Sequence, residues 1–325
     1  MTVAIIGAGM AGLTAARLIA ERTPVVVFDK SRGVGGRMST RYAGDYEFDH
    51  GAQYFTVTDP NFAAFLDTVG PSAQPWDSRG LYLRRGSLEA DTGRPRWVGT
   101  PRMNALPKAM ADGLEVRLGA RVSALSGGPG AVRLSLEDGS EHGPFTHAVL
   151  SVPAPQAAAL LAPSSPLQAR VAGVSMHACF ALMVGFPKEG TDFAPGWDTL
   201  RVSDLPVGWI ARNSAKPGRP DAHHAVVVHA APEWSDRNVD TDREDVRATL
   251  LECASALCGV DLFQAPHIAL HRWLYAYSDA GVGEACLQDA ARGLVVAGDW
   301  CVGGRVEGAH LSGRAAAQAV LRDLG

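Results

Sequence analysis

The chain has 325 residues, of which 46% are hydrophobic, and a formal net charge of −4. This length suits two domains that each bury a core, the lack of a basic surplus argues against nucleic-acid binding, and no apolar run is long enough to span a membrane. The five cysteines are odd in number and lack Cys-x-x-Cys spacing, so we expect free thiols in the cytoplasm and no bound metal.

The N-terminal residues show the pattern of a nucleotide-binding βαβ unit. Apolar runs predict buried parallel strands at 3–6 and 25–29, and between them residues 13–22 predict a helix. The hexapeptide Gly-Ala-Gly-Met-Ala-Gly at 7–12 joins the first strand to this helix. A strand, a G-x-G-x-x-G turn, a helix and a second strand in this order are typical of a site that binds the pyrophosphate of a dinucleotide.

Each glycine of this turn has a physical role. Gly7 permits the tight turn, Gly9 lets a pyrophosphate approach the backbone, and Gly12 lets the helix pack closely on the sheet. The free N–H groups and the dipole at the helix N-terminus attract the phosphates. Asp29 ends the second strand, where its carboxylate would accept hydrogen bonds from a ribose and repel a 2′-phosphate.

A second glycine-rich loop follows Asp29 directly and distinguishes a site for FAD from a site for NAD. Residues 30–38 read Lys-Ser-Arg-Gly-Val-Gly-Gly-Arg-Met, so Gly36 and Arg37 add backbone N–H groups and a guanidinium near a pyrophosphate. A simple NAD domain needs no such loop. The segment resembles the GG-R segment of the FAD-containing superfamily of amine oxidases, phytoene desaturases and protoporphyrinogen oxidases, and this resemblance implies FAD as the cofactor.

The C-terminal residues supply a second part of the same pattern. Residues 293–299 predict a strand that ends in Gly-Asp, and residues 311–321 predict a helix rich in small residues. In the superfamily that the chain resembles, an aspartate at the position of Asp299 holds the ribityl or pyrophosphate part of FAD. The helix N-terminus near 306–309 would face the pyrimidine edge of the flavin, where it stabilises the negative charge of the reduced ring. No cysteine attachment motif is recognisable, so FAD is expected to bind non-covalently.

Four further segments narrow the resemblance. They lie at 49–56, 97–106, 209–219 and 271–276, and in this order and at this chain length they resemble the bacterial renalase-like flavoproteins. The resemblance implies oxidation of the 2- and 6-dihydro isomers of NAD(P)H, with dioxygen as the electron acceptor and with hydrogen peroxide and NAD(P)+ as products. One position departs from the pattern, because Leu274 stands where related chains often carry a basic residue.

We expect an α/β fold with a Rossmann-type FAD-binding domain, similar to those of amine oxidases and p-hydroxybenzoate hydroxylase, and a discontinuous α+β substrate domain. The FAD-binding domain is expected to comprise residues 1–58, 98–157 and 285–325, and the substrate domain residues 59–97 and 158–284. Sequence patterns also predict helices at 103–111 and 242–257, and strands at 114–118, 132–136, 148–152, 180–184 and 225–229.

The motifs and the resemblance together name two sets of candidate site residues. The candidate cofactor-binding residues are Gly7, Gly9, Met10, Ala11, Gly12, Asp29, Lys30, Gly36, Arg37, Met38, Val122, Gly298, Asp299, Val306, Glu307 and Ala309. The protein must also place a flat substrate ring beside the flavin and exclude water. The aromatic, histidine and amide side chains that suit this task are His50, Gln53, Tyr54, Trp209, Asn213, Trp234, His271, Trp273 and Tyr275, although each also fits a structural role.

Two other functions stay open at this point. The chain could be an amine oxidase or a desaturase of the same superfamily, or a FAD-binding protein without catalytic activity. Flavin amine oxidases often carry a lysine near the flavin, whereas none of the four lysines, Lys30, Lys108, Lys188 and Lys216, has the sequence setting of a buried one. The expected partners are therefore a small-molecule substrate, namely a reduced nicotinamide nucleotide isomer, and dioxygen.

Overall fold

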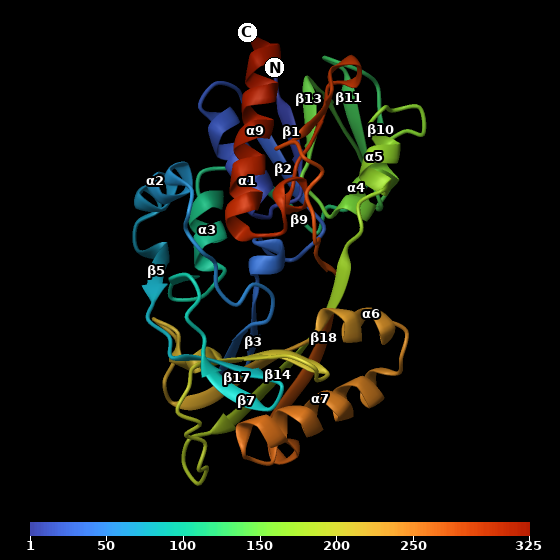
Figure 1. The fold of residues 1–325 in the computed structure, drawn as a ribbon. Coiled ribbons are helices and arrows are strands. Elements are labelled where there is room, and N and C mark those ends of the chain that lie inside the picture. The colour runs from blue at the N-terminus through green and yellow to red at the C-terminus, as the bar shows by residue number, and fades with distance from the viewer.

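The computed structural model describes all 325 residues and consists of two bodies, one above the other (Figure 1). Both chain termini lie in the upper body. The chain passes between the two bodies several times, so neither body is a continuous piece of sequence (Figure 1). None of the helices combines the length and the apolar character that crossing a bilayer requires.

The upper body is built on a six-stranded sheet with the strand order β19-β20-β13-β1-β2-β9. Neighbouring strands are parallel except for the edge pair β19 and β20. The six strands are β1 (Val3–Ile6), β2 (Val25–Asp29), β9 (Glu115–Leu118), β13 (His147–Leu150), β19 (Leu287–Asp289) and β20 (Leu294–Val296). Strand β1 is buried along its whole length because both sheet faces are covered: Val3 and Ile5 belong to one apolar cluster, and Ala4 and Ile6 to another.

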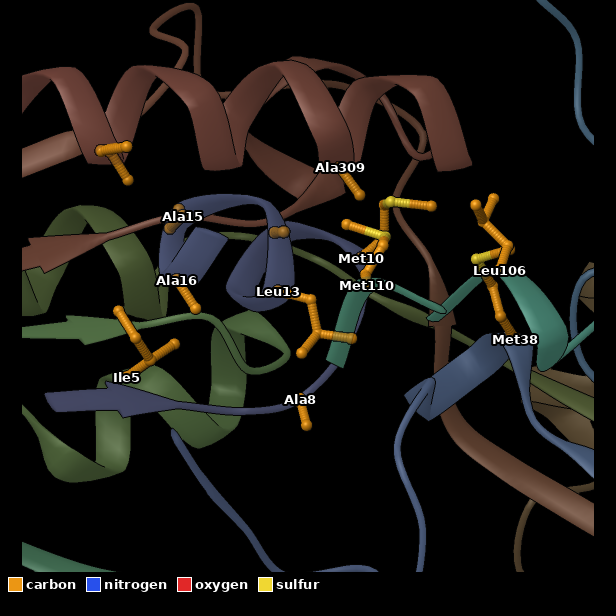
Figure 2. Packing of buried hydrophobic residues seen from close by; sticks show 14 of the residues in the cluster. Ile5, Ala8, Met10, Leu13, Ala15, Ala16, Met38, Leu106, Met110 and Ala309 are labelled. Carbon is orange, nitrogen blue, oxygen red and sulfur yellow. The ribbon is translucent and has the colours of Figure 1, made fainter. Parts of the chain in front are cut away.

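Helices cover one face of this sheet, and helices with a small sheet cover the other. The first face carries α1 (Met10–Ala20), α3 (Ala105–Ala111) and α9 (Val306–Leu324), and the second carries α4 (Ala154–Leu160), α5 (Gln168–Ala172) and the antiparallel strands β10 (Val122–Ser126), β11 (Val132–Leu136) and β12 (Glu141–Phe145). Figure 2 shows how small side chains such as Ala15 and Ala309 let α1 and α9 lie close together. A Cβ atom added at Gly313 would lie 2.2 Å from the carbonyl oxygen of Ala11, so this contact requires glycine.

The lower body contains a seven-stranded sheet with the order β18-β14-β17-β16-β15-β6-β7. Its strands are β6 (Gly80–Arg84), β7 (Ser87–Ala90), β14 (His177–Pro187), β15 (Thr199–Val202), β16 (Val207–Arg212), β17 (His223–Ala230) and β18 (His267–Tyr277). Helix α7 (Arg243–Cys258) packs on one face through Val246, Leu250 and Ala254, and α6 (Pro232–Arg237) lies beside it (Figure 1). The opposite face is turned toward the upper body.

The remaining elements are short. They are β3 (Thr40–Ala43), β4 (Tyr46–Asp49), β5 (Ala73–Trp76), β8 (Arg96–Gly99), α2 (Pro60–Thr68), α8 (Asp299–Val302) and the 3₁₀ turns η1 (Gly36–Met38), η2 (Gly70–Ser72), η3 (Asn213–Ala215), η4 (Leu262–Gln264) and η5 (Ala290–Arg292). Strands β3 and β4 form a hairpin, and Phe48 of β4 packs against Met183 and Val227 of the lower sheet.

The predicted α/β fold class is confirmed, with some differences in the element boundaries. Helix α1 begins at Met10 rather than at residue 13, because Gly9 is already the N-cap and the last residues of the glycine turn form the first helical turn. The C-terminal strand ends at Val296, so Asp299 opens α8 instead of ending the strand, and α9 starts at Val306. Residues 115–118 join the parallel sheet, whereas the strand predicted at 132–136 is the middle strand of the antiparallel sheet β10-β11-β12.

The division into two domains stays a proposal, and the packing favours one change to it. Leu161, Leu167 and Val171 share an apolar cluster with Val122 and Phe145 of the upper body. We therefore propose that the FAD-binding part continues to about residue 172, where the chain enters the lower body at β14.

Candidate functional site

A cavity of about 2100 Å³ lies between the two bodies and is lined by residues of both. It extends from the glycine turn after β1 to the face of the lower sheet formed by β14, β16, β17 and β18. Fourteen of the sixteen candidate cofactor-binding residues line it, namely Gly7, Gly9, Met10, Ala11, Asp29, Lys30, Gly36, Arg37, Met38, Val122, Gly298, Asp299, Val306 and Ala309. The candidate substrate residues that line it are His50, Gln53, Tyr54, Trp209, His271, Trp273 and Tyr275.

The glycine turn has the geometry that its pattern predicts. Gly7 has a φ of +107°, which side chains rarely tolerate, and a Cβ at Gly12 would lie 1.9 Å from the Gly7 carbonyl oxygen. By contrast, a Cβ at Gly9 would meet no protein atom within 4 Å, although Gly9 lines the cavity. Gly12 is therefore a packing residue outside the cavity lining, and Gly9 leaves open space beside the backbone at the start of α1.

Asp29 holds together the two loops that form this end of the cavity. Its Oδ2 accepts a hydrogen bond from the Ala8 N–H and its Oδ1 one from the Ser31 N–H, both at 2.7 Å. The carboxylate thus fixes the glycine turn and the second loop relative to each other. Any hydrogen bond to a ribose would come from the remaining lone pairs of the same oxygens.

An ion pair between Arg37 and Asp299 links the N-terminal and C-terminal parts of the chain. The Arg37 guanidinium lies 2.5 and 2.9 Å from the two carboxylate oxygens of Asp299, and its Nη1 also donates to the Ala276 carbonyl oxygen at 2.8 Å. Both residues line the cavity. Since Ala276 belongs to β18 of the lower body, the pair lies where the two bodies meet. Arg37 therefore holds the second glycine-rich loop, α8 and β18 together.

Buried polar atoms without protein partners mark where a ligand would be held. The Nδ1 atom of His50, the Nε1 atom of Trp209 and the hydroxyl of Tyr277 are buried without a hydrogen-bond partner, and all three residues line the cavity. Such atoms are rare in folded proteins unless a ligand or water satisfies them. Together with the open space at Gly9, they fit an extended dinucleotide cofactor with a flat polar ring.

Aromatic and histidine rings form the walls of the lower part of the cavity. The ring centroids of Tyr54 and Trp209 lie 5.3 Å apart, and those of His50 and Trp273 lie 5.0 Å apart. The Trp273 indole N–H donates to the His50 carbonyl oxygen at 2.9 Å, and the His271 ring contacts both His50 and Trp273. These rings present aromatic surface to the cavity, which suits contact with a flat ring.

The histidines at this end are uncharged at neutral pH. Burial, followed by the positive charge of Arg41 among other groups, lowers the pKa of His271 to about 4. Burial also lowers the pKa of His50 to about 3 and that of His229 to about 4. These residues therefore offer neutral imidazoles to a ligand rather than imidazolium ions.

A buried ionic cluster of Asp49, Lys216 and Arg219 lies behind this wall. The Lys216 side chain is fully buried, and its Nζ donates to Asp49 Oδ2 and to Gln53 Oε1, each at 3.3 Å. Arg219 pairs with the same Asp49 oxygen at 2.5 Å. Lys216 is therefore buried although it follows a turn in a Pro/Gly-rich segment, because the loop after β16 folds back against β4. Lys216 itself does not line the cavity.

Three candidate residues, Asn213, Trp234 and Glu307, are turned away from the cavity. The amide of Asn213 donates to the Glu47 carbonyl oxygen and accepts from the Asp49 N–H. Trp234 packs edge-on against Phe180 at 6.2 Å, and the Glu307 carboxylate accepts from the Thr58 and Asp59 N–H groups. Gln53 does line the cavity, but its amide already bonds Lys216, Gly51 and His229. These positions follow from contacts between segments distant in sequence.

Arginines are the group of lining residues that the sequence patterns miss. Arg41, Arg94, Arg96, Arg201 and Arg272 all line the cavity toward the lower body. The guanidinium of Arg96 lies 5.0 Å from the ring centroid of Tyr54 and 5.2 Å from that of Trp209, a cation–π arrangement. No motif points to these residues, because they come from four different strands and one loop.

The parallel sheet, the glycine turn and the shared cavity together define an oxidoreductase of the dinucleotide-cofactor class. The chain belongs to the family of flavin containing amine oxidoreductases, whose pattern it matches over residues 81–321. Residues 5–69 also match an NAD(P)-binding Rossmann-like domain. The protein is therefore a flavin-dependent oxidoreductase with FAD as its cofactor.

Solved structures of similar fold agree with this family. One is a protein provisionally assigned as a protoporphyrinogen oxidase from Exiguobacterium sp. 255-15, with a TM-score of 0.80, 13% identity and coverage of 99% of this chain and 98% of that one. Another is the cyclohexylamine oxidase of Brevibacterium oxydans IH-35A, with a TM-score of 0.77, 14% identity and 99% coverage of both chains. Identities this low establish the fold alone.

A curated relative is similar to one short region only. The 4,4′-diapophytoene desaturase of Staphylococcus haemolyticus (strain JCSC1435) is 42% identical over 69 residues, which is 21% of this chain and 14% of the desaturase. The chain thus matches only a small part of that relative's length.

Proposed function

We propose that the protein oxidises the 2- and 6-dihydro isomers of NAD(P)H, as the renalase-like flavoproteins do. The observation that carries this proposal is the charge of the cavity. Eleven lysines and arginines line it but only three acids, Asp29, Glu137 and Asp299, in a chain whose net charge is −4. All three acids come from the upper body, so no carboxylate lines the lower part. A positive cavity favours a substrate that carries phosphate and disfavours a protonated amine.

When bound, FAD supplies hydride acceptance from the substrate ring and reoxidation by dioxygen, which yields hydrogen peroxide. The chain's own residues bind and orient the substrate. Tyr54, Trp209 and Trp273 confine a flat ring, and the unpartnered Nδ1 of His50 and Nε1 of Trp209 are available to its polar substituent. Because the neighbouring histidines are neutral, no imidazolium opposes the positive pyridinium ring of the product.

An amine oxidase is the second candidate function. It is favoured by the family to which the chain belongs and by solved neighbours that are named putrescine oxidase and cyclohexylamine oxidase. It is disfavoured by the missing carboxylate at the lower end of the cavity and by the position of Lys216, which lies behind Gln53 and outside the cavity. A FAD-binding protein without activity is the third reading. We keep a cytoplasmic location as part of the proposal because the five cysteines are free thiols.

Anaerobic stopped-flow mixing separates these functions. The holoenzyme is mixed with 2-, 6- and 4-dihydro-NAD(P) and with a panel of primary amines, and the flavin absorbance is followed. We expect rapid bleaching by the 2- or 6-dihydro isomer, slow bleaching by the 4-dihydro form, and hydrogen peroxide after air is admitted. Bleaching by amines alone would replace the proposal with the amine oxidase function, and bleaching by no compound would favour the inactive binding protein.

A further inference from the structure

One edge of the cavity carries three arginines, Arg94, Arg96 and Arg201, and the last two share the carboxylate of Asp91. Arg96 is nearly buried, pairs with Asp91 at 2.5 Å, and also donates to Ser78 and Thr199. Arg201 lies 3.8 Å from the same Asp91 oxygen, and 45% of its side chain is exposed. Arg94 is exposed on the loop that leads into β8. Because Asp91 lies closer to Arg96 than to Arg201, it neutralises mainly the charge of Arg96. The positive charges of Arg94 and Arg201 therefore contribute to the potential in the cavity.

This edge adjoins the aromatic wall. Arg201 lies directly opposite Trp209 in the register of β15 and β16, so their side chains are neighbours on one face of the sheet. Arg96 lies over Trp209 and Tyr54 and fixes both rings through its buried hydrogen bonds. A flat ring bound against Trp209 would therefore have the half-exposed guanidinium of Arg201 beside it, and Arg94 lines the same cavity from the loop that carries Asp91.

Two exposed guanidinium groups suit one kind of ligand group. The planar fork of an arginine matches the oxygens of a phosphate in a bidentate manner. Two other arginines of the lower cavity are placed differently, since Arg272 is held by the Val239 carbonyl oxygen and the charge of Arg41 acts on His50 and His271. We propose that Arg94 and Arg201 bind the phosphate attached to the ribose of the substrate, so that the enzyme distinguishes a nucleotide from the corresponding nucleoside. This inference rests on the proposed function and identifies the residues that bind the phosphate of its substrate.

The test compares the holoenzyme with the R94Q/R201Q double variant and with R133Q, an exposed arginine variant on β11 outside the cavity. Binding of nicotinamide mononucleotide and of nicotinamide riboside is measured from the change in flavin absorbance. We expect the double variant to bind the mononucleotide about tenfold more weakly, because one or more charge-assisted hydrogen bonds are lost. Binding of the riboside, and both affinities in R133Q, should stay unchanged.

A second readout uses turnover and salt. In the double variant the KM for a dihydro-nicotinamide nucleotide should rise while kcat stays unchanged, and added salt should weaken mononucleotide binding less than in the wild type. Equal loss of both ligands, or equal wild-type affinity for both, would overturn the phosphate site even if turnover is normal. If no dihydro-nicotinamide reduces the flavin, the proposed function fails. In that case binding of inorganic pyrophosphate to the wild type and not to the double variant would still support an anion site at these arginines, and equal binding would refute it.

Discussion

Replacing Asp49 by asparagine is the most direct test of the buried ionic cluster. Asp49 is fully buried and accepts hydrogen bonds from Arg219 at 2.5 Å, Thr40 at 2.7 Å, the Met103 N–H at 3.0 Å and Lys216 at 3.3 Å. The asparagine side chain of D49N would offer one acceptor oxygen in place of two and no negative charge. The two cations would then be buried without a counter-ion, so we expect a loss of about 3–5 kcal/mol in the free energy of unfolding.

The effect has a defined pH dependence. Burial alone would raise the pKa of Asp49, but the charges of Lys216 and Arg219 and the hydrogen bonds lower it from 3.8 to about 2. A carboxyl group with a lowered pKa stabilises the folded state fully above its unfolded pKa and loses that contribution as the pH falls toward the folded pKa. The contribution of the Asp49 charge to the difference between wild type and D49N should thus be complete at neutral pH and shrink by about 2 kcal/mol between pH 4 and pH 2.

The measurement is a urea titration of the holoprotein followed by tryptophan fluorescence and circular dichroism. Lys216→Met serves as the matched control, because it removes the longer of the two ion pairs of Asp49 and the donor of the Gln53 oxygen but leaves the closer Asp49–Arg219 pair intact. We expect K216M to lose about 1–2 kcal/mol. Losses of equal size in both variants, or a D49N protein within about 1 kcal/mol of the wild type, would refute this account of the cluster.

Other expected outcomes concern the cofactor site. Gly9→Ala should leave the stability of the apoprotein unchanged but weaken FAD binding in an equilibrium titration, because the new Cβ meets open space beside the cavity. Gly12→Ala should unfold at lower urea, because its Cβ would overlap the Gly7 carbonyl oxygen. A destabilised Gly9→Ala together with a stable Gly12→Ala would contradict the site. Asp29→Ala and Asp299→Ala should each weaken FAD binding by about 1.5–3 kcal/mol, since each removes charge-assisted hydrogen bonds that shape the cavity, and unchanged affinity in both would disprove the assignment. Acid precipitation should release all flavin into the supernatant, and flavin retained on the polypeptide would show a covalent bond. Iodoacetamide should label Cys179, Cys258 and Cys301 only after unfolding, because burial raises the pKa of each thiol to about 12, and peptide mapping of the native protein after labelling at pH 8 checks this.

Local sequence patterns are sufficient to predict the nucleotide-binding half of this protein. The apolar runs around the glycine turn predict strand, turn and helix, because each depends on residues only a few positions apart. The same local rules identify Gly7, Gly9 and Asp29, since the constraints of a tight turn and a strand end are local. Fourteen of the sixteen residues named for the cofactor therefore line the cavity.

The rest of the site depends on contacts between segments that are distant in sequence. Lys216 reaches Asp49 and Gln53 across more than 160 positions, and Arg37 reaches Asp299 across 262. Neither contact leaves a periodic pattern, because it depends on how loops fold back rather than on helix or strand spacing. The same holds for Arg94 and Arg201, which reach the cavity from separate elements and acquire a common role only because β15, β16 and the loop before β8 meet beside Trp209.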